Sequence, residues 1–155
     1  TGFDRGHIAA DATFDYDLEV LKKTYSMANI VPQYPNVNRK VWANIEELER
    51  YNVSQFGSLY VENFILYGNE TLKKLPLEEI LLERKFKDKK HENNYIKKYI
   101  KDSENLEKKE IYVPTFFIKK MFNEKYNFSE CFKVPNLKDL DLNIDNYKID
   151  CNSSF

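Results

Sequence analysis

The clearest periodic pattern in the sequence lies between residues 40 and 51. Hydrophobic side chains recur there at three- and four-residue spacing, namely Val41, Ile45, Leu48 and Tyr51. Such spacing gathers apolar side chains on one face of an α-helix. We therefore predict an amphipathic helix over residues 40–51, with Asn36 or Asn38 as its N-cap residue.

Other segments are rich in β-branched and aromatic residues, which favour strands. Residues 26–31 form a candidate strand leading into a proline-interrupted loop at 32–35. Residues 55–67 and 111–122 are further candidate strands. The remaining segments indicate strand edge and loop over 1–17, a short helix over 75–82, and little regular structure over 136–155. Together the elements predict an α+β fold with an antiparallel sheet and packed helices.

The composition indicates a single folded domain over residues 1–155. That length is sufficient for a hydrophobic core, and aromatic residues, which are scarce in disordered chains, make up 15%. The net charge of −1 argues against a protein that only holds nucleic acid, because such proteins usually carry a basic excess. No apolar run approaches the roughly 20 residues that span a bilayer, so no membrane partner is expected.

Two cysteines, Cys131 and Cys151, are too few for a disulfide scaffold and lack a short metal-binding spacing. They could form one bridge near the C-terminus or remain two reduced thiols. The sequence leaves both alternatives open.

Residues 83–110 form a charged insert that differs in character from the rest of the chain. The plain interpretation is a solvated surface helix or loop. The functional interpretation is a basic arm whose lysines, including Lys97 and Lys98, bind phosphates. His91 also lies in this insert and is interpreted as a surface residue, not as a second base.

The tetrapeptide Asp4-Arg5-Gly6-His7 carries the first candidate chemistry. An arginine can bind phosphate oxygens in a bidentate fork, and a histidine can take a proton from water near neutral pH. We expect the glycine to let the backbone turn. Taken alone, these four residues are more often a strand-end turn with an exposed histidine.

Asn38, Trp42 and Glu46 form a second group, with four-residue spacing. On a regular helix Asn38 and Glu46 lie within about 80° of each other and roughly 12 Å apart along the axis. They cannot both bind one ion directly, but one can ligate it while the other reaches a water on it, which suits Mg²⁺. The plain alternative makes Asn38 an N-cap, Trp42 a core residue and Glu46 a solvated residue.

The two groups match one family in order and spacing. Asp4-Arg5-Gly6-His7 is followed by Asn29-Ile30-Val31-Pro32-Gln33, and then by Asn38 with Trp42 and Glu46. In these motifs the chain resembles the DNA/RNA non-specific endonucleases of the ββα-metal (His-Me finger) superfamily. The likeness is strong over residues 3–50, and a looser one extends to about residue 120 through the segment 111–119, which is similar to a later strand of the family.

The resemblance implies catalytic roles. His7 would be the general base that activates water, and Asn38 would be the one protein ligand of a hydrated Mg²⁺, with Mn²⁺ as an alternative ion. Glu46 would hold a water on the metal, and Arg5 would steady the phosphate.

The resemblance also implies supporting roles. Asn29 matches a position that supports the site, and Asp4 is expected to orient the loop. Trp42 is still interpreted as core. Arg39 joins Arg5, Lys97 and Lys98 as a candidate substrate-binding residue.

The function implied is a metal-dependent endonuclease that hydrolyses phosphodiester bonds of DNA and RNA. Little sequence specificity is expected, because contacts to phosphate carry no direct sequence information. Family members are often secreted or periplasmic, and others sit in organelles. The cysteine pair leans towards an oxidising compartment. A protein inhibitor is a further candidate partner, and the oligomeric state is not fixed.

The chain departs from the family pattern at its start. The family carries further strands and another phosphate-facing arginine before the Asp-Arg-Gly-His stretch, whereas three residues precede it here. The chain is therefore expected to be the C-terminal portion of a nuclease domain, or an abbreviated domain. Two alternatives follow: a DNA-only nuclease of the same superfamily, or a truncated non-catalytic nucleic-acid-binding domain.

Overall fold

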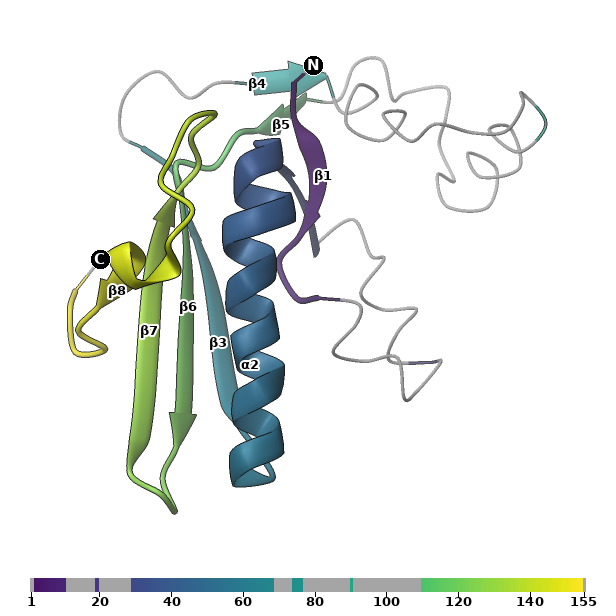
Figure 1. The fold of residues 1–155 in the computed structure, drawn as a ribbon. Helices are drawn as coiled ribbons and strands as arrows, with labels where there is room; N and C mark the ends of the chain where they lie inside the picture. The colour runs from purple at the N-terminus through teal and green to yellow at the C-terminus, as the bar shows by residue number, and fades with distance from the viewer. Residues whose placement is uncertain are drawn as a thin grey trace.

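The computed structural model describes residues 2–10, 19, 29–68, 74–76, 90 and 110–154. Within these residues the chain is a mixture of antiparallel sheets and one long helix, as Figure 1 shows. The predicted α+β class is confirmed. No helix in the described ranges has the length and apolar character needed to cross a membrane.

The largest sheet has four strands in the order β3-β6-β7-β8. Its strands are β3 (Tyr60–Leu66), β6 (Phe116–Asn123), β7 (Phe128–Pro135) and β8 (Lys148–Ile149). Every neighbouring pair is antiparallel. The long helix lies beside this sheet, and its apolar side chains pack against those of β6 and β7.

Two further sheets have two strands each. One pairs β1 (Asp4–His7) with β2 (Ile30–Gln33), and the other pairs β4 (Lys74–Pro76) with β5 (Glu110–Tyr112). In Figure 1, β1 runs alongside the N-terminal half of the long helix, which brings the Asp-Arg-Gly-His stretch to that end. The segment that resembled one later family strand is divided between β5 and β6.

The helix predicted over residues 40–51 is confirmed and is longer at both ends. It begins as a π-helix, η3 (Val37–Trp42), and continues as α2 (Ala43–Phe56). It ends at Gly57, whose φ of 81° is a left-handed conformation that glycine adopts without steric cost.

Asn36, one of the two predicted caps, occupies the N-cap position of η3, but its side chain does not cap the helix. Asn36 has helical backbone angles (φ −67°, ψ −29°) and makes no side-chain capping bond. Its Nδ2 instead donates to the carbonyl oxygen of Lys138 at 3.1 Å. Asn38 lies within the π-helix itself.

Several strand and loop predictions also need correction. The proline loop expected over 32–35 is wrong at its start, because Pro32 and Gln33 belong to β2. A strand with one paired neighbour tolerates proline, since its missing N–H can face away from the ladder. Residues 55–56 belong to α2. Residues 75–76, expected as helix, are strand, and 77–82 lie outside the described residues.

The C-terminal half contains elements that the sequence pattern did not indicate. Strand β7 falls in a stretch that received no assignment. The tail contains a 3₁₀-helix, η5 (Ile144–Tyr147), followed by β8. Asn143 caps η5, because its side chain accepts a hydrogen bond from the Asp145 amide at 3.1 Å.

The main hydrophobic core lies between the helix and the sheet. Trp42 is 1% exposed, which confirms its predicted core position, and its ring contacts Phe117 of β6 at 5.7 Å between centroids. Val31 of β2 joins the same cluster. The ribbon of β1 and β2 is therefore fixed to the helix and, through the helix, to the large sheet.

A buried ion pair crosses this core. Lys119 of β6, 1% exposed, donates to the carboxylate of Glu49 on α2, which is 6% exposed. The Lys119 ammonium also lies 5.2 Å from the centre of the Trp42 ring. Two charges at such a depth are tolerable only as a pair, because each has lost its hydration.

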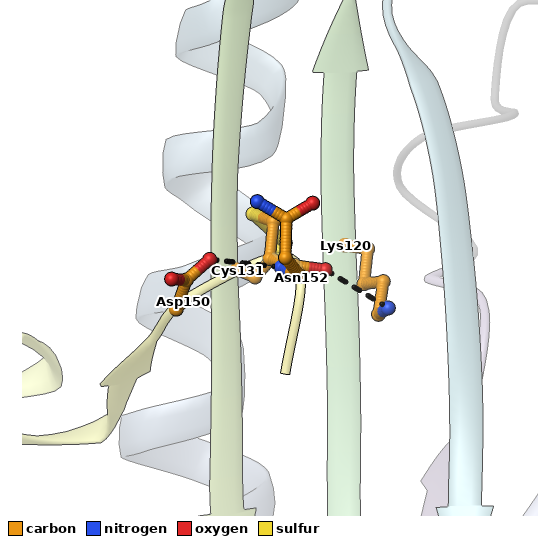
Figure 2. Close-up of a disulfide and its surroundings, with 5 residues drawn as sticks. Lys120, Cys131, Asp150 and Asn152 are labelled. Atoms are coloured by element: carbon orange, nitrogen blue, oxygen red, sulfur yellow. Dashed lines mark hydrogen bonds between the residues drawn. A yellow bond between two sulfur atoms is a disulfide. The ribbon is translucent and has the colours of Figure 1, made fainter. Parts of the chain in front are cut away.

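A disulfide joins Cys131 of β7 to Cys151, with an S–S distance of 2.08 Å and a sequence separation of 20. Of the two alternatives left open by the sequence, the structure has the bridge. Figure 2 shows its surroundings, where Lys120 Nζ donates to the Cys151 carbonyl at 3.3 Å. The bridge fixes the C-terminal tail against the sheet.

The ion pair yields the first prediction. Lys119→Met leaves the Glu49 carboxylate buried without its counter-charge, and we expect it to lower the free energy of unfolding by about 3–5 kcal/mol. The double variant Lys119→Met/Glu49→Leu should recover most of that loss, since it leaves no buried charge. Urea denaturation of the three proteins measures this. A double variant no more stable than Lys119→Met would contradict it.

The disulfide yields the second prediction. Closing a loop of this length restricts the unfolded chain, so the double variant Cys131→Ser/Cys151→Ser should lose about 3 kcal/mol of stability. Reductant should destabilise the parent by a similar amount and leave the double variant unchanged. Equal urea midpoints for the parent with and without reductant would show that the bridge contributes nothing.

Candidate active site

The Asp-Arg-Gly-His stretch forms strand β1 and pairs along its whole length with β2. Asp4 lies opposite Gln33, and His7 lies opposite Ile30. The ladder continues one step beyond the strand, where the Ile8 amide donates to the Asn29 carbonyl at 2.9 Å. The stretch is therefore regular strand up to and including His7.

Asn29 fixes the backbone just beyond His7. Its Oδ1 accepts a hydrogen bond from the Ala9 amide at 2.8 Å, and its Nδ2 donates to the Ala9 carbonyl at 2.9 Å. One side chain thus satisfies both backbone groups of a residue two positions after the histidine. This geometry is suited to the supporting role expected of Asn29.

Gly6 is required for close packing and not for a turn. It lies within β1, opposite Val31. A Cβ atom built on it would lie 2.1 Å from Oε1 of Gln33, whose side chain is fully buried. The expectation that this glycine bends the backbone is wrong, because Gly6 lies inside a regular paired strand.

Asp4 connects the ribbon to the helix. Its carboxylate accepts hydrogen bonds from Arg39 Nε at 2.7 Å and Arg39 Nη2 at 2.6 Å, and from Asn38 Nδ2 at 3.0 Å. An ionised carboxylate only accepts, so it must face the amide nitrogen of Asn38. The Oδ1 atom of Asn38, the kind of oxygen that binds hard cations, is thereby directed away from Asp4.

The structure gives Arg39 a partner within the protein. Its guanidinium is bidentate on Asp4 although its side chain is 68% exposed. From its sequence, Arg39 is a candidate substrate-binding residue. The structure shows a second use, which is to hold the carboxylate that orients Asn38.

Strand alternation distributes the β1 side chains between two faces. Arg5 and His7 share the face that carries Ile30, whose hydrophobic neighbours include Phe3 and Leu75. Asp4 shares the opposite face, on which the helix lies. The described contacts therefore join Asn38 to Asp4 but not to His7. Within the described residues β1 has one paired neighbour, so the two faces meet at its other edge.

The remaining predicted site residues have different outcomes. Glu46 is half-buried in the first turn of α2. His7 is also half-buried, and its Nε2 atom is shielded from solvent. Lys97 and Lys98 lie outside the described residues, as does most of the charged insert.

The π-helix changes the geometry expected for Asn38 and Glu46. The expected separation assumed regular α-helical spacing throughout, whereas Asn38 and Trp42 both lie in η3. A π-helical turn has a wider ring of backbone atoms and is found often at functional sites. The backbone N–H of Asn38 donates to the Tyr34 carbonyl at 2.9 Å, which holds the start of η3 in place.

The donor set near Asn38 fits a hard cation with few protein ligands. It consists of the side-chain oxygen of Asn38, which the carboxylate of Asp4 orients by accepting a hydrogen bond from Nδ2. Among the described residues no three His, Cys, Asp or Glu side chains are grouped to hold a metal. Any ion here would be held by Asn38 and by waters.

Comparison with known proteins places these features in a family. The family model described as DNA/RNA non-specific endonuclease matches residues 1–152. Mitochondrial endonuclease G from Homo sapiens is 34% identical over 61 residues, which are 39% of this chain and 20% of that protein.

Two further nucleases are similar to this chain. A nuclease from Nostoc sp. is 43% identical over 61 residues, which are 39% of this chain and 22% of that protein. Nuclease 1, mitochondrial, from Schizosaccharomyces pombe is 32% identical over 68 residues, which are 43% of this chain and 21% of that protein. The chain thus spans about a fifth of the length of these relatives. With the family model matching nearly its whole length, the chain belongs to the DNA/RNA non-specific endonuclease family.

Proposed function

We propose that the chain carries the catalytic centre of a metal-dependent endonuclease that hydrolyses DNA and RNA with little sequence preference. The hydrogen bond between Asp4 and Asn38 is the observation that carries this proposal. It joins the strand bearing Arg5 and His7 to the helix bearing Asn38. The names of the relatives, endonuclease G and nuclease, agree with such an activity.

The element order supports a His-Me finger arrangement. Strands β1 and β2 are antiparallel and are followed directly by the helix η3–α2, which gives the order ββα. We place the scissile phosphate beside β1, near the Asp4–Asn38 contact that joins the strand to the helix. There the phosphate can meet Arg5 and His7 from one face and Asn38 from the other.

Asn38 would hold the metal ion through Oδ1, and Glu46 would accept hydrogen bonds from the ion's water shell. Mg²⁺ suits a site with one protein ligand, and Mn²⁺ can replace it. When bound, the ion would supply Lewis acidity and neutralise charge that builds up on the phosphate. Asp4 and Arg39 would serve this function by keeping the Asn38 oxygen available for the ion.

His7 would act as the general base. The backbone beyond it is fixed by Asn29, which limits movement of the imidazole. A well-positioned base typically contributes 10²–10⁴-fold to rate.

Arg5 would bind phosphate oxygens on the same face of β1 as His7. Arg39, Lys97 and Lys98 would extend this contact along the nucleic acid backbone. None of these groups is assigned to a base edge, so the cleavage rate should not depend on the nucleotide sequence of the substrate. The Cys131–Cys151 bridge supports an oxidising compartment, secreted or periplasmic, for the protein.

The third prediction concerns the base. His7→Ala should lower the cleavage rate at saturating Mg²⁺ by about 10²–10⁴-fold, because it removes proton acceptance. His91→Ala is the matched control and should cleave at the parent rate. Rates on single-stranded DNA, duplex DNA and RNA measure this, and activity on DNA alone would narrow the proposal to a DNA-only nuclease. A His7→Ala variant as fast as the parent would remove His7 from the mechanism.

The fourth prediction concerns the metal ligand. Asn38→Ala should raise the Mg²⁺ concentration for half-maximal rate at least about tenfold, since loss of even an outer partner of a metal ligand costs 10–100-fold in affinity or activity. Asn44→Ala, an exposed asparagine on α2, is the control and should leave the Mg²⁺ dependence unchanged. An unchanged Mg²⁺ dependence in Asn38→Ala would rule out the ligand role.

A further inference from the structure

Asn136, which follows β7, is the centre of a hydrogen-bond cluster far from the catalytic motifs in sequence. It is 6% exposed. Its Nδ2 donates to the Pro32 carbonyl at 3.1 Å and to the Pro114 carbonyl at 2.9 Å, and its Oδ1 accepts from the Tyr34 amide at 3.0 Å. Both amide hydrogens and the amide oxygen are therefore used.

These bonds lead directly to Asn38. Tyr34 lies between β2 and η3, and its amide is held by Asn136 while its carbonyl receives the amide hydrogen of Asn38. The position of η3 relative to β2 thus depends on Tyr34, whose backbone N–H and C=O are both hydrogen-bonded. Asn136 accepts one of these two hydrogen bonds, and it thereby helps to fix the residue at which the helix starts.

The neighbouring backbone strengthens the same connection. The Asn136 amide donates to the Thr115 carbonyl at 2.8 Å, which fixes Asn136 to the start of the large sheet. Two residues later, the Lys138 carbonyl accepts from Asn36 Nδ2 at 3.1 Å. The segment 136–138 therefore holds the turn before η3 at two points.

We propose that Asn136 is a positioning residue for Asn38. By fixing Pro32 and Tyr34 to the sheet, it sets the distance between the β1–β2 ribbon and η3, and so the geometry in which Asp4 orients the Asn38 oxygen. This inference rests on the proposed function, because it assigns a purpose to the placement of the metal ligand.

A carboxamide is the group that fits here. The cluster needs two donors for the carbonyls and one acceptor for the amide, all in one plane and within a buried space. A shorter or apolar side chain leaves those backbone groups unsatisfied, and a carboxylate has no hydrogens to donate. Serine is shorter and cannot reach all three partners, but its hydroxyl keeps one donor and one acceptor in the buried space, which makes it a graded test.

The test compares the parent chain with Asn136→Ala, Asn136→Ser, the control Asn143→Ala and the reference variant Asn38→Ala. Asn143 lies in the same C-terminal segment and also makes a side-chain bond to backbone, but to Asp145 of η5. Mn²⁺ affinity, followed by electron paramagnetic resonance of the free ion, is the main measurement. Cleavage kinetics against Mg²⁺ concentration and the thermal midpoint are recorded for each protein.

We expect Asn136→Ala to weaken Mn²⁺ binding about tenfold and to lower kcat more than it changes KM for nucleic acid. Asn136→Ser should fall between this variant and the parent, and it carries the test if the alanine variant does not fold. Asn143→Ala should lose thermal stability without a change in Mn²⁺ affinity, which separates positioning from a general loss of stability.

Two results overturn the inference, and they differ. If the parent binds Mn²⁺ through Asn38, so that Asn38→Ala loses binding, but both Asn136 variants keep the parent affinity, then Asn136 is structural only. If Asn38→Ala binds Mn²⁺ as tightly as the parent, the proposed metal site itself fails and the role of Asn136 fails with it.

Discussion

The carboxylate of Asp4 is the contact on which the geometry of the candidate site depends. Three N–H groups from two consecutive helix residues, Asn38 and Arg39, converge on it. Its contribution to stability is small, since Arg39 is largely exposed and such pairs are worth roughly 0–1 kcal/mol. Its main effect is to orient the side-chain amide of Asn38. Because an ionised carboxylate cannot donate, it fixes which end of the Asn38 amide faces outward.

That orientation is useful only if the ribbon and the helix stay in one arrangement. Three independent features provide this. Val31 of the ribbon packs into the same core as Trp42 of the helix, the Lys119–Glu49 pair joins the helix to the sheet, and Asn136 joins the sheet back to the end of the ribbon. The buried ion pair and the buried carboxamide both disfavour movement of the ribbon relative to the helix. Any such shift would leave polar groups without hydrogen-bond partners and shielded from water.

The sequence predicted those parts of the site that depend on local pattern. The amphipathic helix and the core position of Trp42 follow from spacing, and the family motifs lie on strand, strand and helix in the expected order. The errors came from contacts that are distant in the chain. Asn38 is not a cap, because its side chain is bound by Asp4, 34 residues away. Gly6 does not turn the chain, because it pairs with Val31 of β2 inside a strand, and the buried Gln33 side chain leaves no room for a Cβ there. Asn136 lies 102 residues from Tyr34, and nothing in its own neighbourhood marks it.

In the proposed site, the imidazole of His7 and the Oδ1 atom of Asn38 face one metal ion beside β1. Because the chain has two histidines, a sample with ¹³C-labelled histidine gives two ring signals, and His91→Ala assigns them. The account predicts that small additions of Mn²⁺ broaden the His7 signal by paramagnetic relaxation, and that Asn38→Ala abolishes this effect. A His7 signal that stays sharp while Mn²⁺ binds through Asn38 would place the base and the ion at separate sites and contradict the account.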